Sequence, residues 1–220
     1  MARNAVWHDE YWLLLLQLYL RHPVGLKPLY SRDMVGLSLE LHISPQSLRR
    51  RMEQIARLDT PRLERIWKTY STDPKRLERA ANLLRSMKGF GAADDFYEGV
   101  EVQETFELDF RPLPADERYM PVMFILILDL YFQLTPATMV ARTPEVVELA
   151  RLIKLKPNDV VEVLDVMQIC DPYLGRTEVT LSPLLLPCQQ VWQRFSDHEP
   201  PQLHQLAEEL KEYFKSSSYK

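Results

Sequence analysis

Apolar positions predict helices over most of the chain. The two most apolar runs, Tyr11–Leu20 and Val122–Leu134, indicate buried core helices, because each is far shorter than the roughly 20 residues that a membrane-spanning helix needs. Elsewhere a capping side chain stands directly before a proline, a combination typical of helix starts. These pairs are Ser44-Pro45, Thr60-Pro61, Asp73-Pro74, Thr143-Pro144 and Ser182-Pro183. We therefore predict an all-α fold.

The sequence also matches itself after a shift of 112 residues, as from Leu14–Tyr19 to Leu126–Tyr131. Apolar positions and helix starts agree over most of both copies, and the shift grows after an insertion around Asp171–Pro187. Beyond this insertion, Trp67 corresponds to Trp192. Self-similarity of this kind indicates repeated structural units. We predict two divergent tandem helical repeats, each of about five helices.

Charge differs between the two copies. Residues 1–91 hold 16 Lys and Arg against 9 Asp and Glu, a net charge of +7, whereas residues 92–220 hold 11 against 22, a net charge of −11. Such asymmetry favours different partners for the two halves, or attraction between them. The predicted domains are a basic helical unit (residues 1–91), a linker (92–120) and an acidic helical unit (121–220). Only 6 glycines beside 16 prolines also favour short helices over a sandwich or barrel.

Within the linker, apolar and polar residues alternate from Val100 to Phe110, with Glu104 as the exception. A period of two is typical of a strand with one buried face. A strand needs a neighbour for its backbone hydrogen bonds. We expect that neighbour to be Glu178–Leu181 or the same strand in a second copy of the chain. The sequence thus predicts one short central strand in an otherwise helical protein.

The segment Leu37–Met52 resembles the helix-turn-helix of bacterial regulators and sigma factors. Ser38 is small enough to let two helices approach, and Ser44 is placed to cap the second helix. His42 stands where the family usually has glycine, and histidine tolerates a positive φ better than most other residues. The segment Leu149–Leu164 repeats the pattern. The apolar residues expected between the two helices of the first copy are Leu41, Ile43, Leu48 and Met52.

The second helix of the first copy is basic, and that of the second copy is acidic. Arginine and glutamine recognise guanine and adenine edges, and a helix of this kind enters the major groove of DNA. Carboxylates at Asn158–Asp165 in the second copy would be repelled by phosphates. Only the first copy is therefore expected to bind double-stranded DNA. The candidate DNA-binding residues are Gln46, Ser47, Arg49, Arg50 and Gln54, with Arg32 and Arg57 nearby.

We favour a non-enzymatic regulatory binding protein that contacts DNA through the first helix-turn-helix. The acidic second unit or the central strand would then bind a protein partner or form a homo-oligomer. The alternative is a protein-interaction or scaffold module that binds no nucleic acid. Helix-turn-helix cores also serve as packing units, Arg49–Arg51 fits a solvated helix face, and the isoelectric point near 5.8 is low for a dedicated DNA-binding protein.

No pattern in the sequence predicts catalysis. The five histidines lack metal-ligand spacing, and Cys170 and Cys188 fit neither a metal knuckle nor a redox pair. We therefore expect no enzyme activity, no cofactor and no metal. Acidic residues among the first ten positions argue against a secretory signal, so we expect a cytoplasmic protein with reduced thiols and no membrane association.

Three stretches resemble a family of uncharacterised bacterial proteins associated with the Bacteroidetes. They are Met87–Gly91, Phe96–Val100 and Cys170–Leu174, and the resemblance extends along most of the chain. It implies a bacterial source but no particular activity.

Overall fold

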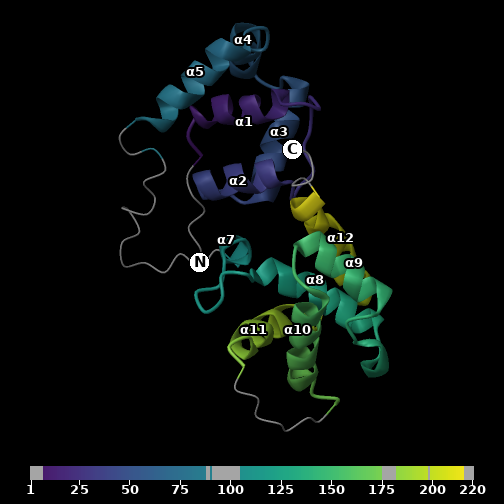
Figure 1. Ribbon diagram of the computed structural model, residues 1–220. Helices are drawn as coiled ribbons and strands as arrows, with labels where there is room; N and C mark the ends of the chain where they lie inside the picture. Colours follow the sequence, from purple (N-terminus) through teal and green to yellow (C-terminus); the bar gives the residue numbers. More distant parts are fainter. Residues whose placement is uncertain (1–6, 88–89, 91–104, 175–181, 198, 216–220) are drawn as a thin grey trace. The chain divides into compact units, whose positions relative to one another are not determined.

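The structure is a computed structural model that describes residues 7–87, 90, 105–174, 182–197 and 199–215 (Figure 1). Every regular element in these ranges is a helix, apart from an isolated antiparallel bridge between Leu113 and Asp116. The predicted all-α fold is confirmed. The chain divides into two compact units, Met1–Glu107 and Leu108–Lys220. Of the predicted linker, residues 92–104 lie outside the described ranges, and the rest is shared between the two units.

The first unit begins with three helices that all contact one another: α1 (Tyr11–Leu20), α2 (Arg32–Leu41) and α3 (Pro45–Arg57). Two further helices follow, α4 (Pro61–Tyr70) and α5 (Pro74–Arg85), and α5 packs against both α1 and α4. The apolar faces of these helices form one core. Its most buried members include Leu14, Leu15, Leu16, Met34, Leu48, Met52 and Ala81.

Capping side chains set the starts of three of these helices, as predicted. Ser44, Thr60 and Asp73 each accept a hydrogen bond from the backbone N–H three residues later, and each precedes a proline. The first helical N–H would have no partner in any helix, so proline loses nothing at that position. The boundaries of α3, α4 and α5 therefore follow directly from local sequence.

The second unit is arranged around α8 (Pro121–Gln133), in which every residue from Val122 to Tyr131 is buried. A helix that is apolar on all sides must be surrounded by other elements. Four helices contact it, and Figure 1 shows them placed around it. They are α9 (Pro144–Ile153), α10 (Pro157–Cys170), α11 (Leu185–Phe195) and α12 (Pro200–Lys215); the short 3-10 helix η1 (Pro136–Thr138) directly follows α8.

Asp129 is the one charged residue within α8, and polar partners explain its burial. Its carboxylate accepts a hydrogen bond from Gln133 Nε2 at 2.8 Å, and His204 Nδ1 lies 3.1 Å from it. A buried carboxylate without such partners would carry a large desolvation penalty.

Corresponding elements of the two units recur at the predicted shift. The bounds of α2 and α9 differ by 112 residues at both ends, and α3 and α10 begin 112 residues apart. Aromatic pairs also correspond: Tyr19 and Trp67 meet edge to face at 6.0 Å between ring centroids, and Tyr131 and Trp192 do so at 5.5 Å. These correspondences are those that two divergent copies of one unit predict.

In the second unit, one predicted helix start is confirmed and one is wrong. α9 begins at Pro144, directly after Thr143, as predicted. Thr143 makes no side-chain cap for α9, because its hydroxyl instead donates to the Thr138 carbonyl. Ser182-Pro183 precedes α11 without beginning it: the Ser182 hydroxyl accepts from the Leu184 N–H, and the helix starts at Leu185.

The predicted central strand is also wrong where it can be compared. Its residues 100–104, and the expected neighbour at 178–181, lie outside the described ranges, but Thr105–Asp109 form a short helix, α7. The buried side chains there are Glu107 and Asp109, while Leu108 is exposed. Phe110, on the predicted buried face, is buried as expected, but Leu108 is not. The alternation placed Glu107 and Asp109 on the exposed side, whereas both carboxylates are buried against cationic or imidazole partners that lie far away in sequence.

Asp109 is held by Arg194 of the second unit. The two guanidinium nitrogens donate to the two carboxylate oxygens at 2.7 and 2.8 Å. Asp109 is buried and Arg194 is half-buried, so the pair is screened from water more than a surface pair.

We expect Asp109→Ala to lower the free energy of unfolding by about 1.5–3 kcal/mol, because it leaves a half-buried guanidinium without its charged acceptor. Urea unfolding measures this loss. Glu117→Ala is the matched control, since that carboxylate is exposed and should change stability by less than about 0.5 kcal/mol. Equal losses in the two variants would contradict a role for the ion pair.

Candidate nucleic-acid interface

A tight turn joins α2 to α3 in the first unit. His42 adopts a left-handed conformation with φ 54° and ψ 33°, as its place in the turn predicts. Ser38 has no exposed surface, and its hydroxyl donates to the Ile43 carbonyl across the turn. The residues predicted to lie between the two helices are all buried: Leu41, Ile43, Leu48 and Met52.

A second contact supports the same turn. Nδ1 of His42 lies 2.9 Å from the Glu107 carboxylate, and Glu107 is itself buried. The imidazole thus links the α2–α3 turn to the first half of α7 within the first unit. No local sequence pattern indicates this contact, because the two residues are 65 positions apart.

The outer face of α3 carries four exposed polar side chains: Gln46, Arg50, Gln54 and Arg57. Their spacing of four, four and three residues places them on one side of a helix. The opposite side, which includes Leu48, is buried in the core. Among the described residues, the side chains of Arg50, Gln54 and Arg57 have no hydrogen-bond or ion-pair partner. We call these four residues the α3 face.

Three predicted DNA-binding residues of α3 are bonded within the first unit. Gln46 Nε2 donates to the Tyr30 hydroxyl at 2.8 Å, and the Ser47 hydroxyl accepts from Ser44 Oγ at 3.0 Å. Arg49 donates to the Lys27 carbonyl, and its Nε lies 3.6 Å from Glu53. Gln46 remains exposed. Arg49 instead joins α3 to the loop that contains Lys27, so its guanidinium is not free to bind a ligand.

Lys27, whose carbonyl receives Arg49, is an unusual buried lysine. Its ammonium donates to the Arg21 carbonyl at 2.6 Å and also to the Pro23 carbonyl. Burial lowers the pKa of this lysine, because the charged form loses solvation. The loop before α2 is therefore held together by Lys27 and tied to α3 by Arg49.

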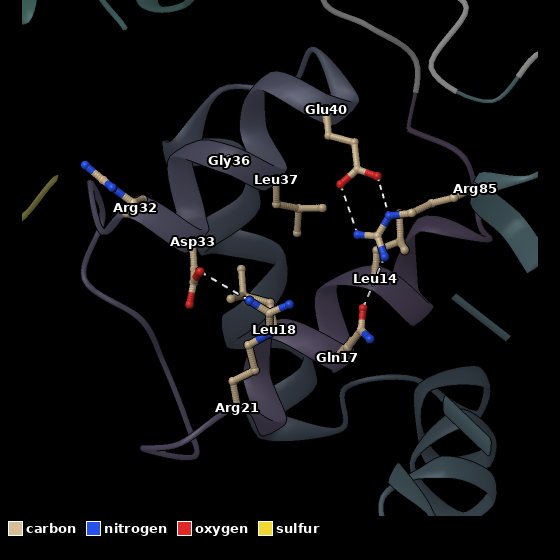
Figure 2. A pocket seen from close by; sticks show the side chains of 10 residues that line it. All are labelled: Leu14, Gln17, Leu18, Arg21, Arg32, Asp33, Gly36, Leu37, Glu40 and Arg85. Carbon is tan, nitrogen blue, oxygen red and sulfur yellow. Dashed lines mark hydrogen bonds and ion pairs between the residues drawn. The ribbon is translucent and has the colours of Figure 1, made fainter. Parts of the chain in front are cut away.

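The last predicted residue, Arg32, belongs to a different part of the first unit. It is exposed on α2 and lines a cavity of about 190 Å³ among α1, α2 and α5 (Figure 2). Three buried leucines supply the apolar lining, and Gly36 adds no side chain. The structure thus brings six of the seven predicted residues together on α3 and leaves Arg32 on α2. The apolar lining residues are Leu14, Leu18 and Leu37.

Charged side chains around this cavity pair with one another. Arg85 donates to both Glu40 carboxylate oxygens, at 2.5 and 3.0 Å, and to Gln17 at 3.4 Å. Arg21 lies 3.2 Å from Asp33 (Figure 2). These contacts join α5 and α1 to α2, so the arrangement is that of an ion-paired contact between helices. This cavity was not predicted from the sequence; the one local signal that could have indicated it is Gly36, a glycine in the middle of a helix.

The corresponding helix of the second unit has the opposite charge. α3 contains four arginines and one glutamate, whereas α10 contains three carboxylates and no basic residue. At the 112-residue shift, Gln46 corresponds to Asn158 and Arg50 to Glu162. Phosphates would therefore be attracted to the α3 face and repelled by its counterpart on α10.

The thiols of the second unit are poor candidates for nucleophiles. Cys170 and Cys188 are both free, and burial raises the pKa of each. Because the thiolate is the reactive form, a raised pKa lowers the reactive fraction at neutral pH. In the part of the chain that the structure describes, no group of three His, Cys, Asp or Glu residues is placed to hold a metal ion.

Among the described helices, none has the length and apolar character needed to cross a membrane. Comparison with protein-family models, curated proteins and solved structures finds no match. The resemblance to the Bacteroidetes-associated family therefore stays a prediction.

The internal bonds of Arg49 predict that the two neighbouring arginines differ in their effect on stability. Arg49→Ala removes a donor to the Lys27 carbonyl and should lower the free energy of unfolding by about 1–2 kcal/mol. Arg50→Ala should change it by less than about 0.5 kcal/mol, because that side chain is exposed and has no partner in the described part of the chain. Thermal unfolding of both variants measures the difference, and a larger loss for Arg50→Ala would contradict the assignment.

Two glycines of the first unit should respond oppositely to alanine. A Cβ at either Gly36 or Gly25 would meet no atom within 4 Å, but Gly25 has φ +125° and Gly36 lies within α2. Gly36→Ala should therefore stabilise the protein by about 0.5–1 kcal/mol through helix propensity. Gly25→Ala should destabilise it through backbone strain. Chemical unfolding compares them, and a loss of stability in Gly36→Ala would contradict the open space beside α2.

Proposed function

We propose that the protein is a non-enzymatic regulatory protein that binds double-stranded DNA through the α3 face. The observation that carries this proposal is the pair Arg50 and Arg57, exposed on one side of α3 without partners among the described residues. Unpaired arginines on one helix face supply the phosphate attraction on which DNA affinity depends.

The dimensions of α3 suit a groove of DNA. From Gln46 to Arg57 the helix rises about 16 Å, at about 1.5 Å per residue. A major groove about 12 Å wide admits an α-helix. The apolar residues between α2 and α3, here called the wedge, are Leu41, Ile43, Leu48 and Met52, and all are buried. α3 packs on α1 and α2 on that side, which leaves its outer side free to enter the groove.

The internal bonds divide the roles of the polar side chains. Arg50 is placed for a base edge or a phosphate, and Arg57, in the last turn, for a phosphate. Arg49 instead fixes the loop that precedes α2. We propose that Gln46 exchanges its bond with Tyr30 for a base contact, because it remains exposed.

A protein-interaction role is the second candidate. Gln46 and Ser47 in the first turn of α3, where helix-turn-helix proteins contact base edges, are both bonded internally. In this alternative, the α3 face binds an acidic protein surface. Binding of a DNA duplex distinguishes the two candidates, because only the first requires DNA.

We expect a mixed-sequence DNA duplex to bind with a dissociation constant of about 10⁻⁶–10⁻⁴ M, weakening steeply as salt rises. Arg50→Ala/Arg57→Ala should reduce the slope of log K against log salt by about 2, because each phosphate contact contributes roughly one unit. Fluorescence anisotropy across a salt series measures both quantities.

The control is Arg65→Ala/Arg79→Ala, which removes the same charge from α4 and α5. The Nε of each of these arginines donates only to a carbonyl of its own helix. The control should keep nearly the wild-type slope. If both double variants lose the same amount of salt slope, net charge alone explains the effect and the α3 face is not the binding site. If the wild type does not bind the duplex at all, the proposed DNA binding is wrong and the protein-interaction candidate remains.

A further inference from the structure

The outer side of α10 carries exposed acidic side chains. Glu162 and Asp165 lie on it together with Asn158, and all three are exposed. Glu162 has no hydrogen-bond or ion-pair partner among the described residues, whereas Asp159 is 3.4 Å from Arg118. We call Asn158, Glu162 and Asp165 the α10 face.

Tyr119 lies close enough to α10 for the carboxylates of that helix to influence its phenol. It is buried, and desolvation together with the charges of Glu162 and Asp159 raises the pKa of Tyr119 to about 12. A negative field that disfavours phenolate formation attracts cations approaching from outside.

The α3 and α10 faces match each other in local geometry. Each helix begins at a proline and follows a residue with a left-handed backbone, His42 in one case and Lys154 in the other. The 112-residue shift pairs Arg50 with Glu162. One chain therefore carries a basic helix face and an acidic one of the same construction.

We propose that the α10 face is a docking surface for the α3 face of a second copy of this chain. The occupant follows from charge complementarity, since the α3 face exposes two arginines, Arg50 and Arg57, and the α10 face exposes two carboxylates, Glu162 and Asp165. The inference takes the α3 face as a binding face from the proposed function. It adds regulation, because an α3 face held by α10 is closed to DNA.

Contact between unlike faces has a consequence for assembly. Each copy that joins through its α3 face still presents an α10 face, so association continues into chains or closes into a ring. Exposed ion pairs are individually weak, so the assembly should require high protein concentration. It should dissociate as salt rises, because the Debye length falls from roughly 10 Å at 0.1 M to about 3 Å at 1 M.

Sedimentation velocity of the full chain without DNA tests the proposal. The wild type should gain mass with concentration at low salt and be monomeric at about 1 M salt. Arg50→Glu alone and Glu162→Arg alone should each stay monomeric, because like charges then face each other. Mixing the two variants, or combining both changes in one chain, should restore association. Recovery on mixing cannot come from a folding defect.

Arg79→Glu and Glu117→Arg are the matched controls, with the same charge changes at exposed positions outside the α3 and α10 faces. They should associate as the wild type does. A wild type that stays monomeric at every concentration, or a mixture that fails to recover, overturns the docking proposal. Duplex anisotropy on the same samples separates the two ideas: the proposed function predicts that Arg50→Glu loses DNA binding and Glu162→Arg keeps it, whatever the association shows.

Discussion

Ser38 lies without exposed surface where α2 turns into α3, and its hydroxyl bonds the Ile43 carbonyl on the far side of the turn. This contact requires a small side chain, because the two helices approach closely there. It also requires the left-handed backbone of His42, which ends α2 and is followed by the start of α3 three residues later. Once both are met, Leu48 and Met52 enter the core and the α3 face must point outward. The candidate interface therefore depends on a turn that carries no binding residue itself.

Burial then decides which basic side chains are available. Four arginines lie on α3, yet Arg49 bonds a carbonyl and Arg51 stacks over the Trp7 ring at 4.0 Å. A guanidinium used in this way contributes packing and hydrogen bonds rather than free charge. Arg50 and Arg57 remain. The charge count of the sequence thus overstates the cationic surface, and helical position separates the structural arginines from the candidate contacts.

Local sequence predicted the parts of the fold that local physics controls. The wedge of α2 and α3 and the capped starts of α3, α4 and α5 follow from side chains within a few residues. The alternating pattern of residues 100–110 predicted a strand wrongly at α7. Glu107 and Asp109 are buried there, and their partners lie 65 and 85 positions away in sequence. The tie between Arg49 and Lys27, like the pairing of Arg85 with Glu40 beside the cavity, depends on tertiary contacts in the same way. Such contacts leave no periodic trace in the sequence.

The corresponding helices also diverge in how much of each remains open. α10 contacts α11, and Val166, which corresponds to the exposed Gln54, is buried. Ile169, which corresponds to Arg57, is half-buried. The last part of α10 is therefore covered, and its outer side is exposed only as far as Asp165. α3 is open along its whole length, as a helix that enters a groove must be, whereas α10 offers a short charged patch that suits docking of another helix. Packing of α11 thus leaves α10 with a smaller exposed face than α3 has.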